Sequence, residues 1–241
     1  MTKRQSVVIV LAQSKGGAGK TTAAITLASE LALLGASVTL IDADPNQHAA
    51  KWAKKPGRPE KIALVENPQG RDIEEHILDD IAQAKQKSSF VIVDLEGTAS
   101  AAAGYGISRA NLVVIAVQGS QDDADEAAKT IRLVRRQEQA FEKSIPYAVL
   151  ITRAPAALNP KILRGIVSDF QEAKTPVLQN RLIDREAFKA IKTYGGTLHD
   201  LQDGEVSGAA KACVDARAFT KEVIELIRST QQSAQAGREV A

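Results

Sequence analysis

The sequence predicts a doubly wound α/β fold, in which helices cover both faces of a mostly parallel sheet. Three observations predict it. Short apolar runs recur along the chain with helical segments between them, and several of these runs are continuous rather than alternating. A Gly-rich loop also joins the first apolar run to the first helical segment. Continuous apolar runs are typical of strands buried on both faces, and alternating strands and helices are typical of parallel sheets.

Each predicted strand is a short, mostly apolar run. The runs are Val7–Ala12, Val38–Ile41, Ile62–Val65, Phe90–Val93, Leu112–Val117 and Tyr147–Ile151. Their lengths suit strands rather than helices. We therefore expect at least these strands in one sheet, with ligands bound at their carboxyl ends.

Helical segments fill the intervals. The stretch Thr21–Ala28 follows the Gly-rich loop, and a helix over 120–142 begins with Ser120 and acidic residues, which suit a helix N-terminus. Pro160 is favourable just before a helix over Lys161–Ala173. A helix over 207–228 carries a modest apolar stripe that favours core packing over membrane binding. The stripe is Ala212, Ala216, Phe219, Val223 and Ile227.

Three segments are expected to lie outside the core elements. Lys51–Pro59 is interpreted as a basic, turn-rich insertion, and Gly97–Gly106 as a mobile loop rich in small residues. No Pro/Gly/Ser-rich linker divides the chain, so we expect a single domain over residues 1–228. Residues 229–241 are polar and are expected to form a frayed tail.

Composition excludes several classes of protein. The net charge is only +2, so any contact with nucleic acid must come from a local basic patch. Cys213 is the single cysteine, which excludes an intramolecular disulfide and suits a reducing cytoplasm. No apolar stretch reaches the length of a membrane-spanning helix, and Met1–Gln5 leaves no room for a signal peptide before the first strand. Three scattered histidines form no metal motif: His48, His76 and His199.

The Gly-rich loop has the composition of a phosphate-binding loop. Residues 15–22 read Lys-Gly-Gly-Ala-Gly-Lys-Thr-Thr, between a strand and a helix. Glycines let backbone N–H groups converge on a phosphate, and the helix adds its positive end. Lys20 supplies charge to the β- and γ-phosphates, and the Thr21 hydroxyl is a ligand for Mg²⁺. The predicted nucleotide contacts are Lys15, Gly16, Gly17, Ala18, Gly19, Lys20, Thr21 and Thr22.

Carboxylates follow two of the predicted strands. The second run continues into Asp42 and Asp44, and the fourth run ends at Asp94. An apolar strand that ends in Asp is the Walker B pattern, which holds Mg²⁺ directly or through water. Asp-Pro also marks turns, so an Asx-type turn at Asp44 is the alternative interpretation.

The loop departs from the general P-loop pattern, because Ser14 stands where a glycine is usual and a second lysine, Lys15, opens it. This loop resembles the deviant Walker A box of the ParA/MinD family of ATPases. The resemblance implies ATP and Mg²⁺ as cofactors, with Asp42 and Asp94 supporting the metal. It further implies that Asp44 orients the attacking water, while Lys15 crosses a dimer interface to the partner's nucleotide. Lys15, Lys20 and Asp44 would then be the catalytic residues.

The resemblance extends to a late segment. Asp184-Arg185-Glu186-Ala187-Phe188 and Tyr194-Gly195-Gly196 resemble the part of the family that lies near the adenine. Asp184 and Arg185 are therefore predicted nucleotide contacts. In DNA-binding members this segment also carries a basic contact, which implies non-specific DNA binding and a place on the nucleoid. The predicted DNA contacts are Arg181, Arg185, Lys189 and Lys192.

The family resemblance implies a homodimer that positions DNA or another cargo, with a ParB-like or cargo-adaptor activator and no stable membrane association. Asn46 stands where Gln is common in the family, and Asp94-Leu95-Glu96-Gly97 replaces the usual Asp-x-x-Pro, so Glu96 is an extra acid near the site. The alternatives are a MinD-like membrane-cycling ATPase, an accessory ATPase of conjugative or T-DNA transfer, and a ligase-like metabolic relative. One cysteine is too few for a nitrogenase-reductase-like cluster.

Overall fold

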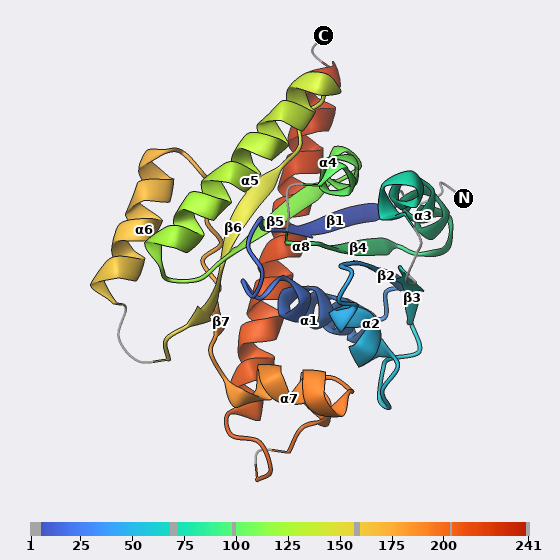
Figure 1. The fold of residues 1–241 in the computed structure, drawn as a ribbon, viewed down its shortest axis with the longest axis vertical. Coiled ribbons are helices and arrows are strands. Elements are labelled where there is room, and N and C mark those ends of the chain that lie inside the picture. The colour runs from blue at the N-terminus through green and yellow to red at the C-terminus, as the bar shows by residue number, and fades with distance from the viewer. Residues whose placement is uncertain (1–5, 68–71, 98–99, 157–159, 203, 240–241) are drawn as a thin grey trace.

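The computed structural model describes residues 6–67, 72–97, 100–156, 160–202 and 204–239. A seven-stranded sheet lies at its centre, with every described pair of neighbouring strands parallel and the order β3-β2-β4-β1-β5-β6-β7 (Figure 1). The strands are β1 (Val7–Ala12), β2 (Val38–Ala43), β3 (Ile62–Glu66), β4 (Phe90–Leu95), β5 (Leu112–Val117), β6 (Tyr147–Ala154) and β7 (Leu182–Ile183). The predicted fold class and the six predicted strands are confirmed.

Helices cover both faces of the sheet, as Figure 1 shows. They are α1 (Lys20–Leu33), α2 (His48–Ala53), α3 (Ile73–Lys87), α4 (Ala101–Ser108), α5 (Gln121–Ala140), α6 (Lys161–Glu172), α7 (Glu186–Tyr194) and α8 (Ala209–Glu239), with a short 3-10 turn at Leu198–Asp200. One core cluster packs α1, α2, α7 and α8 on one face, and a second packs α3, α4, α5 and α6 on the other. Burial on both faces explains why the strands read as continuous apolar runs.

Side-chain caps explain several helix starts. Ser120 accepts a hydrogen bond from the Asp123 amide at the start of α5, as its sequence predicts. Asp72 and Ser100 do the same for α3 and α4. The apolar stripe of α8 is buried in the core beside α1, so the core-packing interpretation of that helix is confirmed. None of the described helices combines the length and the apolar character needed to cross a membrane.

Two local expectations were wrong. Lys51–Ala53 is the end of α2 rather than the start of an irregular insertion, because Trp52 is buried and anchors the segment. Within Gly97–Gly106, a helix begins at Ala101, since Ser100 caps it and the small residues fit against the sheet. Helix α8 continues through Glu239, because Gln, Ala, Arg and Glu favour helix, and the expected frayed tail stays a prediction whose last two residues lie outside the described part of the chain.

The sheet topology determines which side chains meet. Strand β4 lies between β1 and β2, and Asp42 of β2 is the cross-strand partner of Asp94 of β4. The loop that follows β1 leaves the sheet at the same edge, since parallel strands share their carboxyl ends. The predicted phosphate loop and two of the predicted carboxylates are therefore neighbours.

Candidate functional site

The loop between β1 and α1 has the backbone geometry that its glycines predict. Gly17 and Gly19 adopt φ angles of 81° and 90°, which few side chains tolerate. A Cβ at Gly19 would also lie 3.1 Å from Thr152. Helix α1 begins directly after Gly19, with no side-chain cap and no acidic residue in its first turn. Its positive end is therefore free to receive an anion.

The loop is held from behind by the ends of two strands. The Gln118 side chain, just beyond β5, donates a hydrogen bond to the Gly17 carbonyl at 2.7 Å. Thr152 of β6 donates to the Ala18 carbonyl at 2.6 Å. These contacts fix the loop through its carbonyl groups and preorganise it, which lowers the entropic cost of binding a phosphate. Sequence reasoning gave neither residue a role at this loop, because their contacts with it join distant parts of the chain.

The two lysines of the loop occupy opposite environments. Lys20 is 5% exposed, and its Nζ donates to the Lys15 carbonyl at 3.3 Å. Burial lowers the pKa of Lys20, while the charges of Asp94, Asp44 and Glu96 oppose that shift. A buried ammonium with one weak partner in the described chain is suited to binding phosphate oxygens.

Lys15 lies at the surface and is paired within the chain. Its side chain is 45% exposed, and its Nζ lies 3.1 Å from Asp123 Oδ1 at the start of α5. Hydrogen bonding to Asp123 raises the pKa of Lys15. The Ser14 hydroxyl also donates to Glu126 of α5 at 2.5 Å. In this conformation Lys15 is directed to α5 rather than to the phosphate position.

The two cross-strand carboxylates differ in their bonding. Asp42 is buried, and its oxygens accept from the amides of Asp44 at 3.1 Å and Ala50 at 2.7 Å. Asp94 is equally buried, but neither of its oxygens has a well-aligned hydrogen bond to another described residue. Burial raises the pKa of Asp94 to about 7, the Thr21 hydroxyl opposes that shift, and the Asp42 charge adds to it.

These groups fit a magnesium ion that is completed by phosphate and water. An unbonded buried carboxylate is costly, and a divalent cation would remove that cost. Mg²⁺ is typically held by one or two carboxylates together with substrate phosphates and water. Within the described chain no cluster of three or more His, Cys, Asp or Glu side chains could hold a metal alone. Asp94, Asp42 and Thr21 would thus bind the metal only together with a nucleotide.

Asp44 forms the turn that the alternative interpretation predicted. Its carboxylate accepts from the Asn46 backbone at 2.8 Å and from the Asn46 side chain at 2.9 Å. Its charge still acts on Lys20 and Asp94, so it lies at the edge of the site. On the other side, a Cβ at Gly97 would lie 3.0 Å from the Gly16 amide. The atypical segment after β4 therefore packs closely on the phosphate loop.

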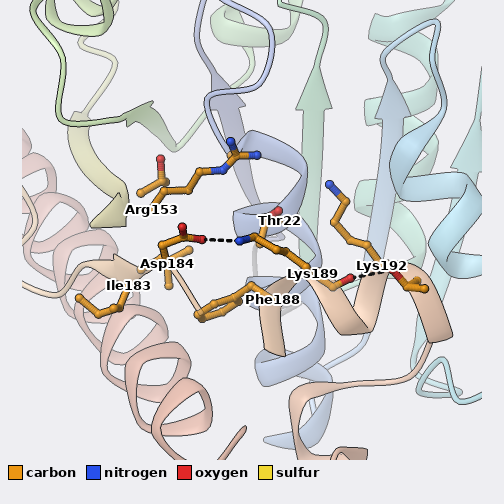
Figure 2. Close-up of a pocket in the computed structure, with 11 residues that line it drawn as sticks. Thr22, Arg153, Ile183, Asp184, Phe188, Lys189 and Lys192 are labelled. Carbon is orange, nitrogen blue, oxygen red and sulfur yellow. Dashed lines mark hydrogen bonds and ion pairs between the residues drawn. The ribbon is translucent and has the colours of Figure 1, made fainter. Parts of the chain in front are cut away.

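A pocket of about 370 Å³ adjoins the loop, and Figure 2 shows the side chains around it. Gly19 and Thr22 line one wall, while Arg153 and residues from β7 and α7 line the others. Asp184 lies in this lining and pairs with Lys189 at 3.1 Å. The predicted nucleotide contact Asp184 is thus placed beside the loop. Sequence reasoning missed Arg153, whose φ of 49° is unusual for a residue with a side chain.

The predicted DNA contacts do not form one exposed patch. Arg185 does not line the pocket, and its Nε is bonded to Asp215 of α8 at 2.8 Å. Lys192 lines the pocket. Burial and the charge of Arg153 lower its pKa, and the Asp94 charge only partly opposes that shift. Lys189 is exposed but paired, and Arg181 is half-buried with an interaction of its own. Only part of this cluster faces solvent.

A Gly-rich loop with a buried lysine, strand-end carboxylates beside it and an all-parallel sheet define a P-loop protein of the ParA/MinD class. Residues 7–230 match the VirC1 protein family, and the chain belongs to that family. It is 34% identical to Protein ParA of Rhizobium radiobacter over 90% of this chain and 96% of that protein. It is 31% identical to Protein virC1 of Rhizobium rhizogenes over 75% and 78% of the two chains.

The fold is also that of a solved structure, a complex of a Cyanothece McdA variant with ATP. The TM-score is 0.75 at 16% identity, and the match covers 92% of this chain and 97% of that one. At this identity the likeness shows the shared fold alone. The predicted family is confirmed by the family match and the sequence relatives.

Proposed function

We propose that this protein is a Mg²⁺-dependent ATPase that binds ATP between two copies of the chain and binds DNA without sequence preference. One observation carries the nucleotide part of the proposal. Buried Lys20 and buried Asp94 face the same loop, and neither is fully satisfied by the described chain. A nucleotide phosphate with its magnesium ion would satisfy both charges at once. The ATP bound to McdA, which has the same fold, supports the choice of nucleotide.

Dimerisation is proposed because Lys15 has no role at its own phosphate loop. Lys20 already supplies the buried charge, while the Lys15 side chain is 45% exposed and pairs with the buried Asp123 carboxylate of α5. The Asp123 carboxylate also accepts a hydrogen bond from the Ser120 hydroxyl, so it keeps a partner when Lys15 leaves it for the nucleotide of the second copy. There it would stabilise transferred charge as an arginine finger does in trans. Hydrolysis would remove the γ-phosphate contacts and let the two copies separate.

The test separates nucleotide binding from dimerisation. Lys15→Ala is expected to bind ATP normally but to remain monomeric. Asp44→Ala is expected to accumulate as an ATP-bound dimer with hydrolysis largely lost. Light scattering and phosphate release, each with and without ATP, measure both properties. A Lys15→Ala protein that dimerises like the wild type contradicts the sandwich arrangement.

We further propose that the ATP-bound dimer uses DNA binding to position a cargo. An ATP-dependent, sequence-independent DNA binder can use the nucleoid to position a plasmid, a chromosome region or another cargo. A ParB-like protein or a cargo adaptor would then stimulate hydrolysis. An accessory role in conjugative or T-DNA transfer is the alternative within the same biochemistry. Wild-type dimer that ignores duplex DNA at low salt in ATP would rule out the nucleoid role.

A further inference from the structure

The basic segment 51–59 has no part in the site described above, yet it is firmly built into the fold. Trp52 is 1% exposed, and its indole Nε1 donates to the Gly196 carbonyl at 2.8 Å. Gly57 has a φ of 84°, and a Cβ there would lie 2.8 Å from the Gly196 Cα atom. The end of α2 and the turn after it therefore pack directly against the chain that follows α7.

Lys55 connects this segment to the carboxyl end of α7 by hydrogen bonds. The Lys55 Nζ donates to the carbonyls of Lys192 and Thr193 at 2.6 Å each, at the carboxyl end of α7. A cation there satisfies the last carbonyls of the helix and suits its negative end. Lys55 thus joins α2 to α7 and is not available for another partner.

The remaining cations of the segment face solvent. Lys51, Lys54 and Arg58 are all exposed, and together they are called the α2 basic surface here. Within the described chain Lys51 and Arg58 form no ion pair, and Lys54 is paired with Glu66 at 2.5 Å. Lys54 is 59% exposed in that pair, so the pair is weak and exchangeable. Lys51 and Lys54 are three residues apart and share one helix face.

An open hollow of about 550 Å³ lies at this surface. Lys54, Lys55 and Arg58 line it, with Glu66 as its one carboxylate. Apolar side chains contribute only Ala53 and Leu64. Peptide grooves rely on apolar pockets, whereas phosphate backbones are bound mainly by charge. The composition of the hollow therefore favours a polyphosphate partner over an acidic polypeptide.

The α2 basic surface is also linked to the nucleotide site. Helix α2 begins beside Asp42, whose Oδ2 accepts from the Ala50 amide at 2.7 Å. The side chain of Gln47, the residue before α2, donates to the Asn67 carbonyl. A change in the position of Asp42 would thus be transmitted to the helix that presents Lys51 and Lys54. This link offers a physical route by which nucleotide could change the exposure of the surface.

We propose that the α2 basic surface of Lys51, Lys54 and Arg58 binds the phosphate backbone of duplex DNA. This inference rests on the proposed DNA-binding function and relocates its main surface from α7 to α2. The reason is that Arg185 is held by Asp215 and Lys192 lines the nucleotide pocket, while Lys51, Lys54 and Arg58 are all exposed. Glu66 opposes DNA binding, because it holds Lys54 and places a negative charge beside the phosphates.

The experiment measures duplex binding in ATP by fluorescence anisotropy at several salt concentrations. The variants are Arg58→Glu, Lys54→Glu and Glu66→Gln, and the control is Arg132→Glu on exposed α5 at the other face of the sheet. A plot of the logarithm of DNA affinity against the logarithm of salt concentration has a negative slope. Loss of one phosphate contact per protomer should reduce the magnitude of that slope by about 1.8 for a dimer. Arg58→Glu and Lys54→Glu should weaken binding, Glu66→Gln should tighten it several-fold, and Arg132→Glu should match wild type.

The possible failures are distinguishable. If wild-type dimer ignores DNA at low salt, the proposed DNA function fails and this inference fails with it. If wild type binds and the α2 variants bind equally well, DNA binding stands and the surface is misplaced. A labelled polyglutamate peptide serves as a second probe. If Arg58→Glu loses polyglutamate but keeps DNA, the surface binds an acidic polypeptide and the inference is overturned. Retained ATP affinity in each variant checks that the protein is folded.

Discussion

The phosphate-loop end of the sheet and the α7 segment both carry clusters of charged residues. The charges at the loop are buried and largely unpaired, whereas those around α7 form ion pairs within the chain. At the loop, Lys20 and Asp94 are buried with few or no partners in the described chain. In and around α7, Arg185 is bonded to Asp215 and Lys189 to Asp184. Charge density alone therefore does not distinguish a ligand site from a structural network.

The physical reason for the difference is the cost of burial. A buried charge without a partner is destabilising by several kcal/mol, so it persists only where a ligand compensates it. A charge that is already paired inside the chain gains little from another partner. The unpaired groups at the loop are thus the stronger evidence of function, and variants in the two regions should differ in size and kind of effect.

The largest effect is expected at Lys20. Lys20→Ala should weaken MgATP binding by about a thousandfold, since a buried, charge-assisted contact to phosphate is lost. Isothermal calorimetry measures the affinity. Lys15→Ala is the matched control in the same loop, because Lys15 is exposed and should leave monomer affinity nearly unchanged. Equal ATP affinities in the two variants would contradict the assignment of Lys20, and not Lys15, as the phosphate-binding lysine of the monomer.

The next effect concerns stability and pH at Asp94. Its pKa rises from 3.8 to about 7 in the folded protein, so the folded state binds this proton more tightly than the unfolded state does. Its contribution to stability is therefore present at low pH and is lost as the pH rises from about 4 to about 7. The loss is about 4 kcal/mol at most, because each pKa unit corresponds to about 1.4 kcal/mol.

Asp94→Asn tests this assignment without nucleotide. The variant should be more stable than wild type at pH 8 and nearly equal to it at pH 4, by urea unfolding. Asp42→Asn is the comparison: burial also raises the pKa of Asp42, but two amide hydrogen bonds oppose that rise, so the gain in stability at pH 8 should be smaller than for Asp94→Asn. In the presence of MgATP the order should reverse, because only the wild type gains the metal. A variant that is less stable at pH 8 contradicts the interpretation of Asp94 as an uncompensated charge.

A smaller effect is expected at Arg185. Arg185→Ala should lower the free energy of unfolding by about 1–3 kcal/mol, because it leaves the mostly buried Asp215 carboxylate without its partner. Thermal unfolding measures the change. Arg185→Ala/Asp215→Ala should recover part of the loss, since no lone charge remains. If Arg185→Ala leaves stability unchanged but abolishes DNA binding, Arg185 belongs to an interface and the sequence-based prediction is the better one.

The smallest effect is expected at Lys189. Its ion pair with Asp184 is exposed on both sides, with 67% and 45% of the side chains accessible. Pairs of this kind contribute about 0–1 kcal/mol. Lys189→Ala should therefore change stability by less than Arg185→Ala under the same conditions. A larger loss at Lys189 would show that the α7 network is stabilised in a different way from the one described.

Much of the site could be predicted because its signals are local. The loop over residues 15–22 needs only a strand before it and a helix after it, and both are visible as apolar patterns in the neighbouring sequence. Asp42 and Asp94 lie far apart along the chain, yet strand-end position was enough to place them at one edge. The partners of the charged residues in the segment 184–196 could not be predicted from local signals. Whether Arg185 contacts ligand or Asp215 depends on how α8 packs, and no motif records that packing.

The sequence by itself determined the fold class, the strands and the phosphate loop, because buried strands, helix caps and glycine conformations are encoded over a few residues. Tertiary structure alone decided which charges remain unpaired. Among the described residues neither Asp94 oxygen has a well-aligned hydrogen bond, whereas Asp42, its neighbour in register, accepts from the Asp44 amide just after β2 and from the Ala50 amide in α2. Tertiary structure also decided that the basic segment Lys51–Pro59 is fixed to the fold, because Trp52 donates a hydrogen bond to the Gly196 carbonyl. Pairing between distant side chains depends on three-dimensional contact, which a linear pattern does not contain.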